Sequence, residues 1–307
     1  MTTIHTNLPQ ETAATLPVGA AIALWRADCE LFLSALPKQP LFDLIVTSPP
    51  YLVGKEYERK MGLDDYVAWQ RRIFVACLER LKPTGSICWQ IGTHVTGTAR
   101  KTSLIPLDLL LHPVFTTTGA ILRNRIVWHF GHGLHATYRF SGRHETILWY
   151  SAGNDYYFNL DAVRVPQKYP GKRSHRQGPQ YGTYSGHILG KNPSDLWADI
   201  PNVKGRHQEK SNHPCQFPVA LAERLIRSLS PTGGLIFDPF AGVASTGVAA
   251  IRTGRRFWGC EIKRPYVMTG LGRLAKAQKG TLAVRPLGLP IFDHTKASAD
   301  LRHRVHA

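Results

Sequence analysis

Short apolar runs alternate with segments of helical periodicity along most of the chain, and this alternation predicts an α/β domain. Buried strands are predicted over residues 21–25, 41–46, 86–91, 121–130, 145–150, 235–238 and 256–260. Apolar residues at helical spacing predict helices over 30–36, 64–81, 104–111, 218–229 and 246–252. Asp64 is expected to be the N-cap of the second helix.

The pattern breaks between Val165 and Asn212, where apolar periodicity disappears and Gly, Pro, Tyr, Ser and basic residues dominate. A stretch of this length is either a functional insertion or a solvated loop, and its aromatic residues argue against simple disorder. We therefore divide the chain into a lead-in segment (1–20), the first half of the main domain (21–164), an insertion (165–211), the second half of the same domain (212–278) and a peripheral tail (279–307).

The net charge of the chain indicates a class of binding partner. Lys and Arg total 38 against 21 acidic residues, so the formal net charge of +17 favours a polyanionic partner over a generally basic protein. The five cysteines form no CxxC pair, which indicates reduced thiols and neither a metal site nor a disulfide. No apolar run approaches ~18 residues and no signal peptide is evident, so we expect a cytoplasmic protein without a membrane span.

The strand over 41–46 leads directly into Thr47-Ser48-Pro49-Pro50-Tyr51. Two prolines end the strand and stiffen the tetrapeptide that follows, at the strand end where open α/β sheets bind ligands. Ser48 and the Pro49 carbonyl can accept the two hydrogens of an exocyclic amino group, while Tyr51 can stack on the ring. A plain strand-ending turn is the alternative.

A second informative stretch runs from Leu235 to Gly247 and reads as a strand, a small-residue turn and a helix. The next strand ends at Glu261, about 20 residues beyond the turn, where a carboxylate can accept hydrogen bonds from ribose hydroxyls. Gly242 lets the backbone approach a ligand closely. Because phosphate-binding glycine signatures are missing, a nucleoside such as S-adenosyl-L-methionine fits better than a nucleotide, although another nucleotide is the alternative.

Together these stretches resemble the β-class amino-methylating (N4-cytosine/N6-adenine) DNA methyltransferases over about residues 21–275. Ser48–Tyr51 resembles their motif IV, (D/N/S)PP(Y/F), and Asp238–Gly247 resembles motif I. The resemblance implies a Rossmann-like, S-adenosyl-L-methionine-dependent methyltransferase fold, circularly arranged with the catalytic half first. Phe217 stands where family members often have Lys, and Ala244 where the turn often has a second glycine.

The resemblance also implies roles for individual residues. The catalytic candidates are Ser48, Pro49, Pro50 and Tyr51. The cofactor-binding candidates are Asp28 (motif III), Thr47, Phe217 and Pro218 (motif X), Asp238, Pro239, Phe240, Ala241, Gly242, Ser245, Thr246 and Glu261. The DNA-binding candidates in the insertion are Lys168, Lys172, Arg173, Arg176, Lys191, Lys204 and Arg206, and no metal is expected.

The implied activity is site-specific transfer of a methyl group to cytosine N4, after the base is flipped out of duplex DNA. Ser48 favours cytosine because serine before the prolines is commoner among the N4 enzymes of the family; adenine N6 is the alternative, and a non-catalytic nucleic-acid-binding module is a second one. Pro214-Cys215-Gln216 mimics the nucleophile motif of cytosine-C5 enzymes, but its order in the chain indicates that Cys215 is not catalytic. Besides double-stranded DNA, a second copy of the chain and a cognate restriction enzyme are candidate partners.

Overall fold

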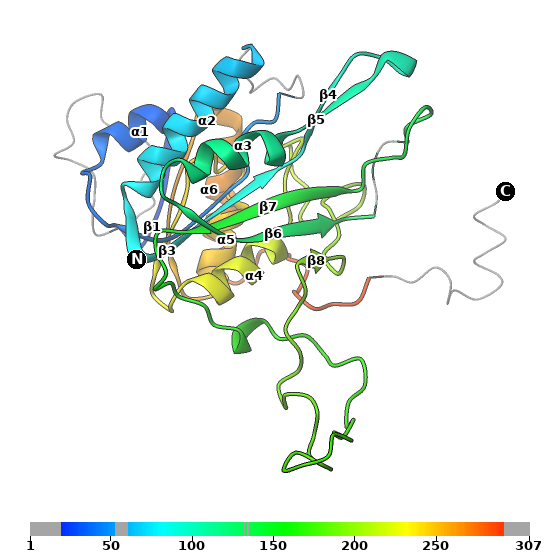
Figure 1. Ribbon diagram of the computed structural model, residues 1–307. Coiled ribbons are helices and arrows are strands. Elements are labelled where there is room, and N and C mark those ends of the chain that lie inside the picture. Colours follow the sequence, from blue (N-terminus) through cyan, green and yellow to red (C-terminus); the bar gives the residue numbers. More distant parts are fainter. Residues whose placement is uncertain (1–19, 53–60, 132, 134, 292–307) are drawn as a thin grey trace.

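The computed structural model describes residues 20–52, 61–131, 133 and 135–291. One eight-stranded sheet organises them (Figure 1), in the order β1-β10-β9-β2-β3-β7-β6-β8. The strands are β1 (Ile22–Arg26), β2 (Phe42–Thr47), β3 (Leu81–Ile91), β6 (Ile121–His129), β7 (His144–Ser151), β8 (Leu196–Trp197), β9 (Leu235–Asp238) and β10 (Arg256–Glu261). The lead-in segment and the end of the predicted tail lie almost wholly outside the described residues.

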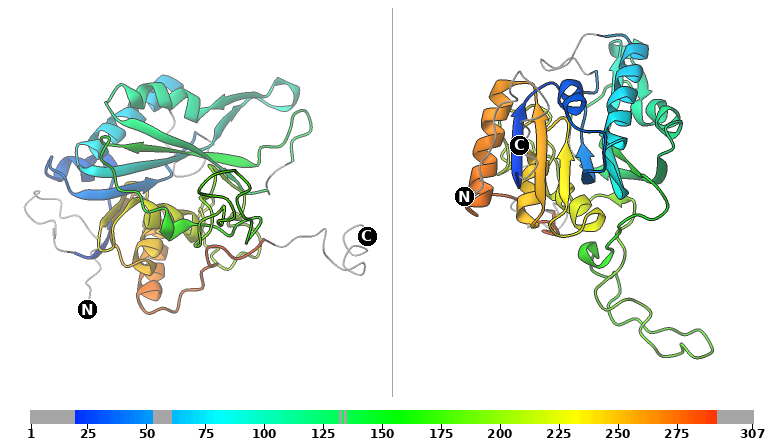
Figure 2. Two further views of the ribbon diagram at one scale, coloured as in Figure 1. Left: turned by 60° about the horizontal axis from the view of Figure 1, so that its bottom comes forward. Right: turned by 90° about the vertical axis from the view of Figure 1, so that its left-hand side faces the viewer.

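Helices cover both faces of this sheet, as the two views of Figure 2 show. One face carries α1 (Cys29–Ala35), α2 (Leu63–Leu78) and α3 (Leu107–Thr116), and the other carries α4 (Val219–Leu229), α5 (Ser245–Arg252) and α6 (Arg264–Gln278). Strand β9 shows how the two cores form, because its side chains alternate between faces: Leu235 and Phe237 join one core and Ile236 the other. Among the described helices, none is long and apolar enough to cross a membrane.

The two halves of the chain meet where β2 pairs in parallel with β9, with Ile45 opposite Phe237. From this pair the connections diverge: β2 leads through α2 to β3 on one side, and β9 leads through α5 to β10 on the other. The two helices lie on opposite faces, so a crevice opens between the carboxyl ends of β2 and β9. The sheet therefore brings the ends of the two predicted motif strands together.

The predicted strands are confirmed, but two helix predictions are corrected. Helix α2 has Gly62 as its N-cap, so Asp64 lies in the first turn, and the helix ends at Leu78 because Leu81 already belongs to β3. The predicted helix over 104–111 begins only at Leu107: Ser103–Pro106 forms β5, which pairs with β4 (Thr93–Thr96). Pro106 disfavours helical backbone at the residue before it, which explains the later start of this helix. Helix α6 was not predicted.

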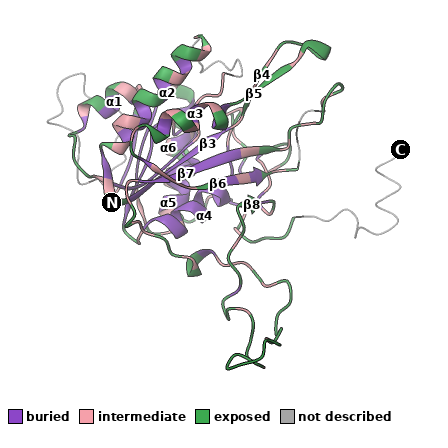
Figure 3. Cartoon of the chain, in the orientation of Figure 1, coloured by how far each residue is buried: buried purple, intermediate pink, exposed green. Residues whose placement is uncertain are grey.

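The predicted insertion leaves the body of the molecule as a long exposed loop (Figures 1 and 3). Two isolated antiparallel bridges close it, one from Val165 to Lys191 and one from Arg173 to Tyr184. The chain then returns to the sheet, where β8 pairs with β6 and Trp197 and Ile200 are buried in the core. Only the first part of the insertion therefore projects freely.

Candidate functional site

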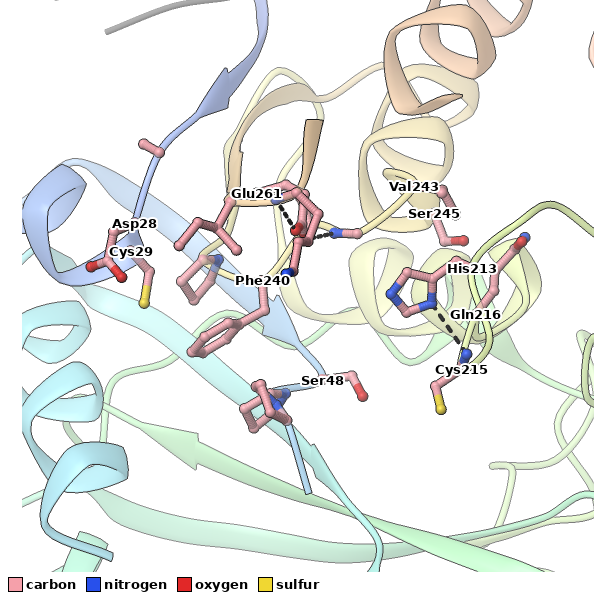
Figure 4. Close-up of a pocket in the computed structure, with 18 of the residues that line it drawn as sticks. Asp28, Cys29, Ser48, His213, Cys215, Gln216, Phe240, Val243, Ser245 and Glu261 are labelled. Atoms are coloured by element: carbon pink, nitrogen blue, oxygen red, sulfur yellow. Dashed lines mark hydrogen bonds between the residues drawn. The ribbon is translucent and has the colours of Figure 1, made fainter. Parts of the chain in front are cut away.

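The crevice between β2 and β9 holds a cavity of about 580 Å³ (Figure 4). Both halves of the chain contribute to its walls, and the contribution of the first half includes Trp69 of α2. Its lining includes the predicted residues Asp28, Ser48, Pro49, Pro50, Tyr51, Phe217, Pro239, Phe240, Ala241, Gly242, Ser245 and Glu261. The predicted residues Thr47, Pro218, Asp238 and Thr246 are buried and do not line it.

Asp238 lies behind the cavity wall and holds the turn together. Its Oδ1 accepts hydrogen bonds from Thr47 Oγ1 at 2.7 Å and from the Phe240 N–H at 3.1 Å, and its Oδ2 accepts one from Thr246 Oγ1 at 2.7 Å. Burial raises the pKa of Asp238 to about 6, although these hydrogen bonds oppose the shift. The carboxylate thus connects β2, β9 and α5 and shapes the wall from outside.

Glu261 and Gly242 form the next part of the wall. Glu261 Oε2 accepts a hydrogen bond from the Gly242 N–H at 3.0 Å, and Oε1 accepts one from the Lys263 N–H at 2.8 Å. Burial raises the pKa of Glu261, while these backbone donors lower it. Gly242 has φ +52°, and a Cβ there would lie 3.3 Å from the His213 ring. The carboxylate is therefore oriented, and the backbone beside it leaves space for a ligand.

Ala244, which stands where the family turn often has a second glycine, has an unusual backbone conformation. Ala244 is the N-cap of α5 and adopts the left-handed conformation, with φ +59° and ψ +42°. Glycine adopts this backbone without strain, whereas a residue with a Cβ does not. Nearby, Arg273 Nη1 donates to the Val243 carbonyl and Ser245 Oγ donates to the Phe217 carbonyl, so α6 and the predicted motif X both support the turn.

Asp28 lines the cavity at the residue just before α1. It is the N-cap of α1, and its Oδ1 accepts hydrogen bonds from the Glu30 N–H at 2.9 Å and the Leu31 N–H at 3.3 Å. This cap keeps the carboxylate fixed at the cavity edge.

Ser48 and Tyr51 line the cavity just beyond the end of β2. Ser48 Oγ lies 2.7 Å from the Tyr51 hydroxyl, which also donates to the Gln90 carbonyl oxygen at 3.2 Å. The Tyr66 hydroxyl donates to the Pro50 carbonyl at 2.9 Å and anchors the tetrapeptide to α2. A Cβ on Gly92 would lie 3.1 Å from the Tyr51 ring, so this glycine gives the ring its space. The tetrapeptide is thus held from three sides.

The segment of the predicted motif X closes the cavity from the side (Figure 4). His213 Nδ1 accepts from the Cys215 N–H at 3.2 Å, and its ring packs edge-on against Tyr266 at 4.5 Å between centroids. Sequence reasoning missed Glu209, whose buried carboxylate accepts from the Val219 N–H at 2.8 Å and the Arg285 N–H at 3.0 Å. This carboxylate ties the segment to the start of α4 and to the predicted tail.

Sequence reasoning also missed Glu145, the second residue of β7. Gln90 Nε2 donates to its Oε2 at 2.6 Å, and burial raises its pKa. The only signal in the sequence was an acidic residue at the start of an otherwise apolar strand. Among the described residues, no group of three or more His, Cys, Asp and Glu side chains could hold a metal ion.

The seven predicted DNA-binding side chains are all exposed, but the structure separates them into two groups. Lys168, Lys172, Arg173, Arg176 and Lys191 lie on the projecting loop, which contains no acidic residue between 165 and 194. Lys204 and Arg206 lie on the returning segment, where Lys204 Nζ donates to the Pro214 carbonyl beside the cavity lining.

A second basic surface was not predicted. It consists of the β4–β5 ribbon and the chain between β6 and β7, at the end of the sheet where β3 and β6 terminate (Figure 1). Arg100 of the ribbon stacks on Tyr138 at 4.9 Å, which joins the two segments. Phe140 beside Arg139 is 99% exposed. Neither segment contains an acidic residue, so this surface also suits a polyanion.

Comparison with known proteins agrees with this geometry. A family model described as DNA methylase (N6_N4_Mtase) matches residues 42–270. The chain is 41% identical over 261 residues to the type II methyltransferase M.BglII of Bacillus subtilis, covering 85% of this chain and 71% of that protein. It is 32% identical over 241 residues to the DNA adenine methyltransferase YhdJ of Escherichia coli K12, covering 76% of each.

Solved structures have the same fold. TTHA0409 of Thermus thermophilus, in complex with S-adenosyl-L-methionine, superimposes with a TM-score of 0.60 and 26% identity, covering 86% of this chain and 99% of that one. The cytosine-N4-specific PvuII DNA methyltransferase gives a TM-score of 0.64 at 20% identity, covering 88% and 95% of the two chains. At 20% identity, the similarity to the PvuII enzyme shows a shared fold and nothing more.

Proposed function

This chain belongs to the DNA methylase family that modifies amino groups with S-adenosyl-L-methionine, and from that premise we propose that it methylates cytosine N4 in duplex DNA. The observation that carries the proposal is the meeting of Ser48 and Glu261 in one cavity. One end offers hydrogen-bond partners for a target amino group, and the other offers a carboxylate for a ribose. The single cavity lets a bound nucleoside cofactor and a flipped base approach each other.

The residues present fit the cofactor. S-adenosyl-L-methionine supplies an electrophilic methyl group when it is bound. The Glu261 carboxylate, oriented by two backbone N–H groups, would accept the ribose hydroxyls. The left-handed Gly242 would allow close approach of the backbone, Asp28 would lie near the adenine, and His213 and Phe217 would border the methionine part.

Ser48, the Pro49 carbonyl and Tyr51 would hold the target base. A base inside a duplex is out of reach, so it must leave the stack at a cost of a few kcal/mol. Stacking on Tyr51 would return roughly 1–3 kcal/mol, by analogy with single-strand binders. Ser48 and the Pro49 carbonyl would accept the amino hydrogens and direct the nitrogen lone pair into the cavity. Catalysis would then come mainly from positioning.

Ser48 supports cytosine N4 over adenine N6. A neutral hydroxyl holds an amino group less strongly than a carboxylate acceptor does, and serine before the prolines is the pattern that resembles the N4 enzymes. Adenine N6 is the second candidate, because a relative with 32% identity is named a DNA adenine methyltransferase.

Mass spectrometry of nucleosides tests this proposal. DNA is incubated with the full-length protein and S-adenosyl-L-methionine, digested, and analysed for N4-methylcytosine and N6-methyladenine. We expect N4-methylcytosine in the wild type and a loss of product in Ser48→Ala. N6-methyladenine without N4-methylcytosine would overturn the choice of base and leave the DNA methyltransferase assignment intact.

We also propose that DNA lies across both basic surfaces. Lys and Arg side chains on the projecting loop would contact phosphates, and the exposed Tyr169, Tyr181 and Tyr184 would add apolar contacts. The surface made of the β4–β5 ribbon and the β6–β7 connection would hold the duplex near the cavity. Because M.BglII is named a type II methyltransferase, a restriction enzyme with the same recognition site would be the functional partner.

A further inference from the structure

Glu145 is half-buried beside the proposed target pocket, and the mechanism above does not use it. Strand β7, which carries Glu145, is the antiparallel neighbour of β3, which carries Gln90. Gln90 Nε2 donates to Glu145 Oε2 at 2.6 Å, and the carboxyl is also hydrogen-bonded to the Tyr51 hydroxyl. Tyr51 in turn lies 2.7 Å from Ser48 Oγ. A continuous line of hydrogen bonds therefore joins Ser48 to a carboxylate that does not line the cavity.

The direction of the protons along this line decides what Ser48 offers to a ligand. A phenol has one proton, whereas a backbone carbonyl and an ionised carboxylate can only accept hydrogen bonds. The Tyr51 proton has two such acceptors within reach, the Gln90 carbonyl at 3.2 Å and Glu145, and in either position it leaves the Tyr51 oxygen as an acceptor toward Ser48. With the Tyr51 proton placed on one of these acceptors, the 2.7 Å bond between Ser48 and Tyr51 uses the Ser48 proton, and Ser48 Oγ presents lone pairs to the cavity.

We propose that Glu145 is a positioning residue that fixes Ser48 as a hydrogen-bond acceptor for the target amino group and receives the proton which that group gives up. The inference rests on the proposed roles of Ser48 and Tyr51. A fixed acceptor matches the N–H donors of an amino group. It also opposes the carbonyl oxygen that thymine carries where cytosine carries its amino group. Glu145 thereby contributes to the choice of substrate as well as to its alignment.

The proton transfer balances along the same line. The lone pair of the amino nitrogen forms the new bond to the methyl carbon, and the electrons of the old bond stay on the departing sulfur. The nitrogen then carries two hydrogens and a positive charge. One proton passes to Ser48 Oγ, the Ser48 proton passes to the Tyr51 oxygen, and the Tyr51 proton passes to Glu145. A neutral methylamino group and a neutral carboxylic acid remain.

Other titratable groups lie close to this line of hydrogen bonds, and the variants used in the test leave them unchanged. Burial raises the pKa of Glu145, which makes it a better proton acceptor, and Lys204 partly offsets this by stabilising the charged form. Tyr66 and Cys215 are close enough to Tyr51 to raise its pKa further, after burial and Glu145. Comparison of variants that leave these groups unchanged isolates the contribution of Glu145.

A double-mutant cycle in the full-length protein tests the hydrogen-bonded line from Ser48 through Tyr51 to Glu145, here called the relay. Single-turnover methylation rates and the affinities for DNA and S-adenosyl-L-methionine are measured for Glu145→Gln, Tyr51→Phe and the double variant. Each single substitution should slow methyl transfer roughly 100-fold, the usual scale of a proton-transfer contribution. Both affinities should stay within about threefold of wild type, since the interaction is needed mainly at the transition state. The double variant should be no slower than the slower single variant, because both break one line.

The pH profile and controls complete the test. In the wild type the rate should fall as Glu145 becomes protonated on acidification, and this limb should be missing in Glu145→Gln. Glu79→Gln removes an exposed carboxylate at the far end of α2 and should leave the rate unchanged. A normal rate in Glu145→Gln, or independent multiplying losses in the cycle, overturns the relay. Tyr51→Phe keeps the ring and so tests the line even if Glu145→Gln does not fold.

One further variant separates the relay from the proposed function. A slow Ser48→Ala with a normal Glu145→Gln overturns the relay and retains the target pocket. A Ser48→Ala variant with the wild-type rate overturns the pocket assignment itself, and the relay with it.

Discussion

Thr47 and Asp238 are 191 residues apart in the sequence, and a 2.7 Å hydrogen bond between their buried side chains joins the two halves of the chain. Thr47 ends the strand that leads into the proposed catalytic tetrapeptide, and Asp238 ends the strand that leads into the proposed cofactor turn. The bond fixes one strand end against the other. Correct spacing of the two half-sites therefore depends on a pair that does not line the cavity.

The buried charge of Asp238 predicts how stability depends on pH. Its pKa is about 6 in the folded protein against 3.8 in the unfolded chain, so the folded state holds the proton longer. The unfolding free energy should therefore fall, through this group, as the pH rises from about 4 to 6. By linkage, the wild type should lose about 3 kcal/mol relative to Asp238→Asn over this range. Urea unfolding across that range measures it, with exposed Asp64→Asn as the control. Parallel pH curves for wild type and Asp238→Asn would contradict the prediction.

Gly242 predicts a separation of ligand binding from stability. Gly242→Ala places a Cβ 3.3 Å from His213 in a left-handed conformation, whereas Gly233→Ala introduces the same type of strain at φ +77° into open space. Each should cost roughly 1 kcal/mol of stability. Only Gly242→Ala should weaken S-adenosyl-L-methionine binding about tenfold or more, measured by isothermal titration calorimetry, because only its Cβ intrudes on the proposed cofactor site. Equal affinities in the two variants would remove Gly242 from that site.

Glu261 predicts a pH dependence of cofactor affinity. Burial raises its pKa, so the carboxylate becomes protonated at a higher pH than an ordinary glutamate. Because the ionised form is the better acceptor for ribose hydroxyls, affinity should weaken on acidification in the wild type. Glu261→Gln should bind weakly at every pH, with a flatter profile in calorimetry across the acidic to neutral range. If the variant keeps the wild-type pH profile, the titrating group is a different one, such as Asp238.

The projecting loop predicts a change in the salt dependence of DNA binding. Arg173 stacks on Tyr184 at 4.6 Å, and Arg176 is exposed nearby. If each contacts one phosphate, Arg173→Ala and Arg176→Ala should each reduce the slope of log affinity against log salt by about 1. Fluorescence anisotropy with a duplex oligonucleotide measures the slope, and Lys38→Ala on the exposed surface beside α1 is the charge-matched control. An unchanged slope in the double arginine variant would favour a solvated loop without DNA contacts.

Local sequence patterns were enough to predict seven of the strands and the two motif ends, whereas β4, β5, β8 and the order of strands in the sheet were not predicted. Local constraints were sufficient there, because apolar periodicity defines buried strands and two prolines end one at Ser48. The same holds for Glu261, which follows an apolar strand at a spacing that suits a ribose. Helix boundaries were predicted less well. Helix α3 begins later than predicted because the residues before it form β5, which pairs with β4.

Which of the predicted residues face the cavity depends on how distant segments of the chain pack together. Asp238 and Thr47 stand at strand ends, as predicted, yet their side chains turn toward each other because β9 and β2 become neighbours. Glu145 reaches Tyr51 because β7 pairs with β3. Such contacts join residues far apart in the chain, and the register of strand pairing fixes them, whereas local sequence fixes only the strands themselves.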